Sequence, residues 1–577
     1  MDDNSQSESL SPEPRPSLTF QSVTFSDGST IEFDDDDIVV FVGPNNAGKS
    51  AALREMEAYL GLNKGGFIVS SATLKKSGDS KSLLRYLELN AQRSENARNT
   101  FYGGIGYNIN MDHVAFFDSD HDRRPVASFF AKRLATETRI QDSNAAGAIA
   151  LFRDPPTSPI HMLLMDEALT AQISDKFRQA FGVDLIPFRG GGGSFPLFVG
   201  EKPSLGGGKD ELSREFIFSL QESCVQLDKQ GDGMRSFATV LLYVIGAGNH
   251  SIQFLDEPEA FLHPPQARLL GRFIAESRRE SSQLFIATHS TDMLDGLIEG
   301  SSAKVRIIRI RREGDINRVK ELSRPQTLKV AKDTLTRFSR VFDGIFFEHV
   351  IICESDADCM FYHSLLSLPS IAGERRPDVL FIHSAGKHRM AKLVDTLRAL
   401  GVPVSVIADI DVLSESNTLR NLVVSLGGDW NEIQSHWRAV STSVQEVRPP
   451  LNASQIKELI LKSVKDLGGV DDFPQETERA IKSIFKSKSP WAAIKQGGRS
   501  ALPNGEPTIQ YDKLAKKCAN FGLWIVPVGE VEGFCRSVGL HGPGFVERVL
   551  DTKDIASDPE LHEAREFIRS IWKMAKS

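Results

Sequence analysis

The chain has 577 residues, of which 40% are hydrophobic and 25% are charged, and its formal net charge is -8. These values are typical of a soluble protein of several domains, and no window offers the ~20 uninterrupted apolar residues that a membrane span needs. The five cysteines contain no CxxC pair, which argues against a disulfide framework or a zinc site. We therefore expect a cytoplasmic protein without membrane contact, and any nucleic-acid surface must be local because the whole chain is acidic.

The N-terminal region begins without structure and leads into a sheet. Residues 1–17 are acidic, polar and proline-containing, and they lack the basic start and apolar core of a signal peptide, so we predict a disordered lead-in. Residues 18–42 alternate apolar and polar side chains, break at Asp27-Gly28, and end in the apolar run at 38–42. This pattern predicts a hairpin that feeds a buried strand.

A phosphate-binding motif follows that strand directly. Residues 43–50 read GPNNAGKS, which fits GxxxxGKS between a strand and a helical run. Glycines let backbone N–H groups surround phosphate oxygens, and the helix N-terminus adds partial positive charge. Lys49 would contact the β- and γ-phosphates of ATP, and the Ser50 hydroxyl would ligate Mg²⁺. The predicted nucleotide-binding residues are Gly43, Asn45, Asn46, Gly48, Lys49 and Ser50.

Residues 60–215 are less regular, and the glycine stretches at 189–194 and 206–208 mark loops, so we predict an insertion there. Strands and helices then alternate up to residue 310, which favours a parallel α/β sheet. Helices are expected at 211–228, 234–246 and 265–280, and strands at 252–255, 284–287 and 305–310.

Two of these strands end in candidate catalytic side chains. Strand 252–255 is followed by Asp256, which would hold Mg²⁺ through water, and Glu257, which would polarise the attacking water. The next strand ends near His289, in position to contact the γ-phosphate, because ligand sites of α/β sheets lie at the carboxyl ends of strands.

The segments GPNNAGKS, FLDEPEAFLHP and ATHS resemble those of the ABC-type ATPases of chromosome organisation and recombinational repair. In that family a signature segment of one subunit closes on the nucleotide of its partner, so the resemblance implies a dimer or a dimer-like closure. The candidate segment is 230–237, where Gly231, Gly233 and Ser236 would grip the partner's γ-phosphate at a helix start. An ordinary glycine turn that caps a helix is the alternative.

The C-terminal part begins a second α/β series after a helical connector at 326–345. Strands are expected at 349–353, 379–382, 404–408 and 523–527, and a polar helical insertion at 415–515. Three of these strands deliver carboxylates at their carboxyl ends. They are Glu354 and Asp358, then Asp409 and Asp411, and finally Glu530 and Glu532. Oxygen clusters of this kind suit Mg²⁺ or Mn²⁺, which could bridge a phosphodiester and activate water.

This pattern resembles the TOPRIM domain of topoisomerases, bacterial primases and OLD-family nucleases. Glu354 matches the strand-end glutamate, Asp409 and Asp411 match the DxD motif, and Asp358 matches the second acidic position of the OLD version. Ser355 stands where a glycine is usual, which leaves the metal ligands intact. TOPRIM sites often need a base or a cation as well, and Lys387 is one candidate. His541 is the other, at a place where relatives would carry a lysine.

An ABC ATPase followed by a TOPRIM domain is the OLD-family layout, and the resemblance covers about residues 18–577. It implies an ATPase domain at 18–325 whose insertion at 60–215 supports dimerisation, and a TOPRIM nuclease domain at 346–577. It also implies a homodimer or a higher homo-oligomer. Some relatives act in antiphage defence, including Gabija-type and retron-associated systems, so the resemblance implies a defence-system partner, either a protein or retron RNA or DNA.

A basic stretch in the C-terminal insertion is a candidate nucleic-acid surface, because lysines neutralise phosphates and aromatic rings stack on unpaired bases. Its residues are Arg479, Lys482, Lys486, Lys488, Lys495 and Arg499, with Phe485 and Trp491 between them. The alternative is a helix with a solvated basic face.

The sequence therefore predicts an ATP-regulated, metal-dependent endonuclease that acts on DNA, in antiphage defence. Two alternatives stay open at this stage: a non-cleaving ATP-driven sensor or scaffold, and a TOPRIM nuclease that acts on RNA or tRNA. Whether ATP activates or inhibits cleavage also stays open.

Overall fold

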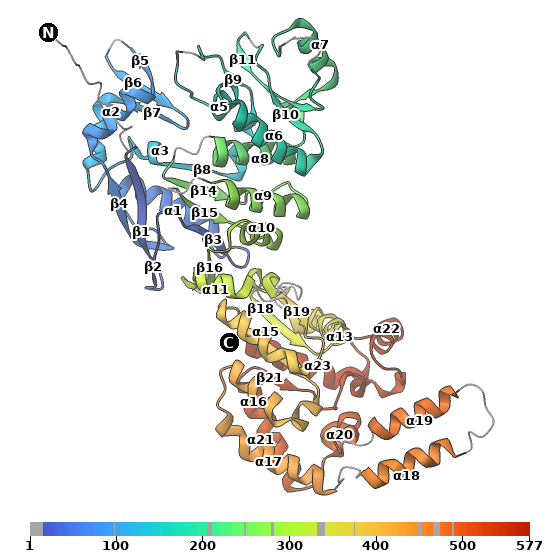
Figure 1. Cartoon of the computed structure of the whole chain (residues 1–577). Coiled ribbons are helices and arrows are strands. Elements are labelled where there is room, and N and C mark those ends of the chain that lie inside the picture. The colour runs from blue at the N-terminus through green and yellow to red at the C-terminus, as the bar shows by residue number, and fades with distance from the viewer. Residues whose placement is uncertain are drawn as a thin grey trace, which may run out of the picture. The chain divides into compact units, whose positions relative to one another are not determined.

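The computed structural model describes residues 15–96, 98–151, 153–190, 192–204, 210–246, 250–278, 282–331, 341–373, 376–447, 453–465, 473–486 and 490–576. The chain divides into two compact units, Met1–Lys332 and Asp333–Ser577 (Figure 1). Among the described residues, no helix is long and apolar enough to cross a membrane.

The first unit is built on a six-stranded sheet in the order β17-β16-β3-β15-β14-β8. All neighbouring strands are parallel except β17, which pairs antiparallel with β16. The strands are β3 (Ile38–Val42), β8 (Ala131–Leu134), β14 (Ile252–Asp256), β15 (Gln283–Ala287), β16 (Val305–Glu313) and β17 (Ile316–Leu322). Every residue of β3, β14 and β15 is buried, as expected for a parallel sheet covered on both faces.

A second, antiparallel sheet lies against this core. It has the order β2-β1-β4, with β1 (Ser17–Phe25), β2 (Thr30–Glu32) and β4 (Val69–Ser77). Strands β1 and β2 pair across the predicted turn, so the N-terminal hairpin is confirmed. Phe20 of β1 packs edge-on against Phe285 of β15, with the ring centroids 5.6 Å apart. Aromatic packing therefore joins the two sheets into one core.

The region 60–215 differs from the continuous insertion that the sequence predicts. Strand β4 pairs with β1, and β8 forms the edge of the main sheet beside β14. Strand β8 reads AKRL, which is too short and too polar to stand out as a buried strand. The elements of this region outside those sheets include β5 (Gln92–Glu95), β6 (Thr100–Gly104), β7 (Tyr107–Asn110), α5 (Pro159–Met165), α6 (Glu167–Phe181), β10 (Asp184–Pro187), β12 (Leu197–Gly200) and α7 (Arg214–Ser223).

Four further helices of the first unit flank the phosphate-loop motif or the strands of the main sheet along the chain. They are α1 (Lys49–Leu62), α8 (Asp232–Leu241), α9 (Pro264–Ser277) and α10 (Thr291–Ser301). Helix α11 (Arg324–Ala331) covers the start of the predicted connector, whereas 332–340 lie outside the described residues. The predicted lead-in also falls outside them up to residue 14.

The second unit is built on a parallel sheet in the order β19-β18-β20-β21. The strands are β18 (His349–Cys353), β19 (Val379–His383), β20 (Val404–Ala408) and β21 (Leu523–Ile525), and the packed helices include α13 (Asp356–Leu366), α15 (Lys387–Ala399), α21 (Glu506–Asn520) and α23 (His562–Lys576). The second α/β series is thereby confirmed.

The predicted insertion at 415–515 consists, in its described residues, of helices joined by short loops. It contains α16 (Ser416–Ser425), α17 (Trp430–Val447), α18 (Ala453–Val464), α19 (Gln475–Lys486) and α20 (Trp491–Gly497), and it leads into α21. Helices α18 and α19 lie side by side and extend from the rest of this unit (Figure 1).

Candidate nucleotide and metal sites

The loop at 43–50 joins β3 to α1, and its backbone requires glycine. Gly43 has φ 140° and Gly48 has φ 100°, both in the region that favours glycine. A Cβ on Gly43 would lie 2.1 Å from the carbonyl oxygen of Ile310. Lys49 is 7% exposed, and its Nζ donates to the carbonyl oxygens of Gly43 and Pro44 at 3.0 Å each. The loop thus folds around its own lysine, as a phosphate-binding loop does.

The two predicted catalytic carboxylates lie at the end of β14, across β15 from that loop. The Asp256 carboxylate hydrogen-bonds to Ser50, which brings the two predicted Mg²⁺ ligands together. Burial raises the pKa of Asp256, and this hydrogen bond opposes the shift. Burial lowers the pKa of Lys49, and the negative charges of Glu257 and Glu259 partly oppose that shift.

His289 follows β15, between the two flanking loops, and contacts Glu257. Its Nδ1 lies 3.2 Å from Glu257 Oε1 and 3.9 Å from Glu259 Oε1. Glu259 is a residue that the sequence reading missed: it is 6% exposed, and its Oε1 accepts a 2.6 Å hydrogen bond from Thr288 Oγ1. Glu259 therefore fixes the strand end that presents His289.

Segment 230–237 starts helix α8, but its serine does not face outward. Ser236 is 0% exposed and sits in the second turn of the helix, whereas Gly231 and Asp232 are exposed at its start. The predicted contact of Ser236 with a partner's nucleotide is corrected on this ground, because a hydroxyl on the packed face of a helix cannot reach a second subunit. Gly231 remains a candidate at the exposed start of the helix, whereas Gly233 is half-buried, and a Cβ on it would lie 2.7 Å from the carbonyl oxygen of Phe261.

In the second unit, the predicted carboxylates converge at the carboxyl end of the sheet. Glu354 follows β18, and Asp409 and Asp411 follow β20. Their ligand oxygens all lie within 4.8 Å of one another. Burial, reinforced by Asp411, raises the pKa of Glu354, and burial with Glu354 raises the pKa of Asp409 well above its usual range. A bound cation would offset this repulsion and favour the ionised carboxylates.

Asp358 is committed elsewhere. It lies in the first turn of α13, where its Oδ2 accepts from the Ser355 amide at 2.9 Å and Ser355 Oγ accepts from the Asp358 amide at 3.2 Å. This reciprocal capping box explains the residue without a metal. Asp358 is not among the oxygens clustered within 4.8 Å, so the structure does not bring it into the predicted ligand set.

Two lysines contact the acidic cluster. Lys495 Nζ, from α20, lies 2.7 Å from Asp409 Oδ2 and 3.8 Å from Asp411 Oδ1. Burial alone would lower the pKa of Lys495, but the contact with Asp409 outweighs it and raises the pKa. Lys387 Nζ lies 3.3 Å from Asp411 Oδ2 and 3.2 Å from Glu415 Oε1. Lys387 therefore lies beside the acidic cluster, where the sequence predicts a basic residue, and Lys495 lies nearer to the cluster's carboxylates than Lys387 does.

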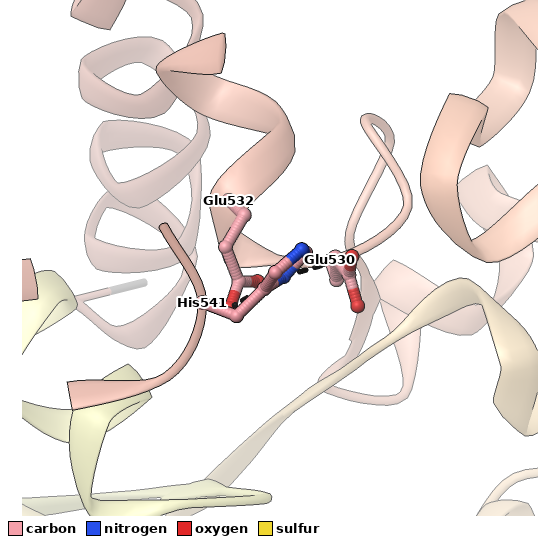
Figure 2. Close-up of side chains that lie close together, drawn as sticks. All are labelled: Glu530, Glu532 and His541. Carbon is pink, nitrogen blue, oxygen red and sulfur yellow. Dashed lines mark ion pairs between the residues drawn. The ribbon is translucent and has the colours of Figure 1, made fainter. Parts of the chain in front are cut away.

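Glu530 and Glu532 follow β21 and form a second cluster with His541. Figure 2 shows the His541 ring between the two carboxylates, with Nδ1 3.9 Å from Glu530 Oε1 and 3.6 Å from Glu532 Oε1. Their ligand atoms also lie within 4.8 Å of one another. Glu532 Oε1 accepts from the Gly542 amide at 2.7 Å, which fixes the loop that carries His541. The histidine is therefore placed as a potential ligand rather than as an isolated base.

The predicted basic surface at 479–499 does not form one surface. Arg479 and Lys482 are exposed on α19, but Trp491 is 4% exposed, Lys495 points into the acidic cluster, and Arg499 forms an ion pair of 2.6 Å with Asp512. Lys488 and the side chains of Phe485 and Lys486 lie outside the described part of the chain. The stretch is divided between α19 and α20, and its described residues therefore have different surroundings, which corrects the prediction.

One known family matches part of the chain. Residues 146–295 match the family model described as "AAA domain, putative AbiEii toxin, Type IV TA system". The match contains Asp256, Glu257 and His289, and it begins after the phosphate-binding loop. No curated protein matches the sequence.

The first unit is an ATP-binding P-loop ATPase domain. The matched segment supplies the carboxylate and histidine ends of two strands, and the loop at 43–50 supplies the phosphate-binding side of the same sheet.

Solved structures of Smc head domains resemble part of this chain, with low TM-scores and low sequence identity. The Smc head bound to the C-winged helix domain of ScpA is 11% identical with a TM-score of 0.33, and the match covers 55% of this chain and 100% of that one. A Pyrococcus furiosus Smc head with an extended coiled coil, bound to the C-terminal domain of ScpA, is 12% identical with a TM-score of 0.30. That match covers 55% of this chain and 98% of the other. The SMC head domain from Thermotoga maritima is 12% identical with a TM-score of 0.27, and the match covers 54% of this chain and 100% of the other. Likenesses of this size do not establish a shared function.

Three side chains near the two sites escaped the sequence reading. Glu259 and Arg139 lie beside the predicted catalytic carboxylates of the ATPase domain, and Lys495, which the sequence places on a nucleic-acid surface, lies in the acidic cluster of the second unit. Glu259 carried a signal, since it follows Asp256 by three residues in a loop already identified. Arg139 and Lys495 carried none, because only the fold brings them to their sites.

Proposed function

We propose that this protein is an ATP-regulated, divalent-metal-dependent endonuclease of the OLD-family type that cleaves DNA. The observation that carries the proposal is the convergence of Glu354, Asp409 and Asp411 within 4.8 Å, in a chain that also holds a P-loop ATPase domain. The assignment to antiphage defence rests on the resemblance of the sequence motifs to that family. An ABC-type closure of two subunits on ATP belongs to the same proposal.

The nucleotide site has the groups that Mg²⁺ and ATP require. Lys49 would hold the β- and γ-phosphates, and Ser50 with Asp256 would hold the cation. Asp256 Oδ1 is buried and makes no hydrogen bond within the described chain, which fits an oxygen that serves a water-bound cation. Glu257 would orient the attacking water, and His289, held near it, would contact the γ-phosphate.

The cluster in the second unit fits Mg²⁺ or Mn²⁺ by its donor set. All three side chains offer carboxylate oxygens, the ligands that hard cations prefer. Asp411 Oδ1 is buried and has no hydrogen bond among the described residues. When bound, a divalent cation would act as a Lewis acid at a scissile phosphodiester. Lys495 would supply a second positive charge on the same side, and Glu530, Glu532 and His541 would offer a further ligand set.

The direct test is cleavage by purified protein of supercoiled plasmid, linear DNA and total RNA, with Mg²⁺ or Mn²⁺ and with or without ATP. Asp409→Asn serves as the matched control, since it keeps the shape of the side chain and removes a charged ligand. We expect metal-dependent cleavage of DNA that the control lacks. Cleavage of RNA alone would mean that the substrate is RNA and not DNA. Absence of cleavage on every substrate would favour a non-cleaving, ATP-driven scaffold.

A further inference from the structure

The turn that carries Glu257 adopts a backbone conformation that a glutamate rarely takes. Glu257 has φ 45°, in the left-handed region, which is unfavourable for a residue with a side chain. Its amide donates to the carbonyl oxygen of Ala287 at 2.8 Å. A strained turn persists only where its surroundings hold it, so the groups that bind its carbonyls determine where the Glu257 carboxylate points.

Arg139 is the one side chain among the described hydrogen bonds that binds both carbonyls, and the Glu257 carbonyl also accepts from the Ala260 amide at 2.9 Å. Arg139 is 0% exposed, and it donates from Nη1 to Asp256 O at 3.1 Å and from Nη2 to Glu257 O at 3.0 Å. Thr136 Oγ1 adds a 3.0 Å hydrogen bond to Asp256 O. The planar fork of a guanidinium reaches two successive carbonyls at once, which a lysine ammonium does not do in the same geometry.

The fold explains why Arg139 arrives there. Strand β8 runs parallel to β14, with Leu134 opposite Leu255. The residues that follow β8, α4 (Thr136–Arg139), therefore run beside the turn that follows β14. Asp256, Glu257 and Glu259 all interact electrostatically with the buried guanidinium. Arg139 thus places a fixed positive charge beneath the catalytic carboxylates while its hydrogen bonds go to the backbone.

A second arginine fixes the chain just after Arg139. Arg235, from α8, donates from Nε to Ser143 Oγ at 3.0 Å and from Nη2 to Ile140 O at 3.0 Å. Its Nη2 also donates to Asn144 Oδ1 at 3.1 Å. Three contacts from one side chain hold the turn at 140–144 against the start of α8, which is the segment proposed to close on a partner's nucleotide.

We propose that Arg139 is a positioning residue for ATP hydrolysis, and that Arg235 acts through it by holding the turn from which Arg139 reaches Glu257. The inference rests on the proposed function of Glu257 as the residue that orients the attacking water. Neither arginine needs to contact ATP. The start of α8 and the catalytic turn are thereby joined through two side chains and one short turn.

The test separates kcat from ATP affinity in four variants: Arg139→Lys, Arg235→Met, the double variant and Glu257→Gln. Arg139→Lys keeps the charge but loses the fork, and we expect kcat to fall about 10-fold, since displacements of ~1 Å can cost up to about 100-fold. Arg235→Met should lower kcat about 3-fold, and ATP affinity should stay within about 2-fold in both. The double variant should be no slower than Arg139→Lys alone, because both changes act on the same turn.

Arg278→Lys is the matched control. Arg278 is also a largely buried arginine that binds a backbone carbonyl, that of Ser282 at 2.7 Å, but this contact lies before β15, at the end of the strand remote from the site. It should lower thermal stability and leave kcat unchanged. Unchanged kcat in Arg139→Lys, or a loss that the Arg278 control shares, would overturn the inference. If the wild type hydrolyses no ATP, the proposed hydrolysis itself is wrong and this inference goes with it.

Discussion

At the scale of the residue, both sites hold buried carboxylates beside a cation from the chain itself. Lys49 and Arg139 lie among the carboxylates of the ATPase domain, and Lys495 lies 2.7 Å from Asp409 in the second unit. Burial raises the pKa of Asp256, Glu259, Glu354 and Asp409 alike. Buried carboxyl groups with raised pKa values reduce the stability of the fold, and such groups are typical of catalytic and metal-binding sites.

Two substitutions separate ATP binding from hydrolysis. Lys49→Ala removes a charge-assisted phosphate contact and should weaken ATP binding at least 10-fold, roughly the worth of one such bond. Glu257→Gln keeps the side-chain shape but cannot polarise water, so it should bind ATP normally and hydrolyse it ~100-fold more slowly. Nucleotide titration and phosphate release measure the two effects. Full hydrolysis by Glu257→Gln would contradict its assignment.

Asp409→Asn should stabilise the metal-free second unit at neutral pH. A carboxyl whose folded pKa is raised stabilises the fold only while it is protonated, and this contribution is lost as pH rises through the folded pKa. In EDTA, the variant should therefore melt above the wild type by a few degrees at neutral pH and lose this advantage as the pH falls toward the ordinary pKa of an aspartate. Added Mn²⁺ should raise the melting temperature of the wild type only. A variant less stable than the wild type at every pH would show that Asp409 is paired as a structural ion pair with Lys495.

Lys495→Met should slow nucleic-acid cleavage about 100-fold, the usual effect of removing one group that stabilises transition-state charge. Lys495→Arg should restore part of the rate, because a cation remains in place, and ATP hydrolysis should not change in either variant. Arg499→Met, which breaks an exposed ion pair near α20, is the control. Faster cleavage by Lys495→Met would mean that the ammonium competes with the metal.

At the scale of the element, the sequence located those strands that are long apolar runs ending in a motif. Strands β3, β14, β15, β18 and β20 were found because buried parallel strands are apolar throughout. Strand β8 was missed because AKRL has no such run, and its role depends on pairing with β14 far along the chain. Ser236 was misjudged for a related reason: a motif read along the chain does not show which face of a helix is packed.

The exposed start of α8 offers a test of subunit closure that Ser236 cannot offer. Nothing lies within 4 Å of a Cβ placed on Gly231, and its φ of -62° is ordinary, so Gly231→Arg should fold normally. If this end closes on a partner's nucleotide, the variant should bind ATP but hydrolyse it about 10-fold more slowly. It should also fail to dimerise with ATP in a Glu257→Gln background, as judged by light scattering. Unimpaired ATP-dependent dimers would show that α8 only begins with a helix cap.

At the scale of the whole molecule, the two sites belong to separate units of one chain. Every predicted nucleotide-site residue lies before Lys332, and every carboxylate of the two candidate metal clusters lies after Asp333. The order of the motifs places the predicted nucleotide site before the carboxylate clusters along the chain, and the domain bounds drawn from it stay a prediction. The sequence could not predict how insertions supply residues to each site, because Arg139 and Lys495 reach theirs only through tertiary packing.

In the function that we propose, the second unit cuts nucleic acid with a metal held by Glu354, Asp409 and Asp411. The most direct measurement is a cleavage assay run beside an ATPase assay on the same preparations of Glu354→Ala, Asp409→Ala and the wild type. We predict that cleavage is lost in both variants, by at least about 100-fold, while ATP hydrolysis is retained, because each change removes a cation ligand and leaves the first unit untouched. Cleavage that survives in both variants would contradict the account.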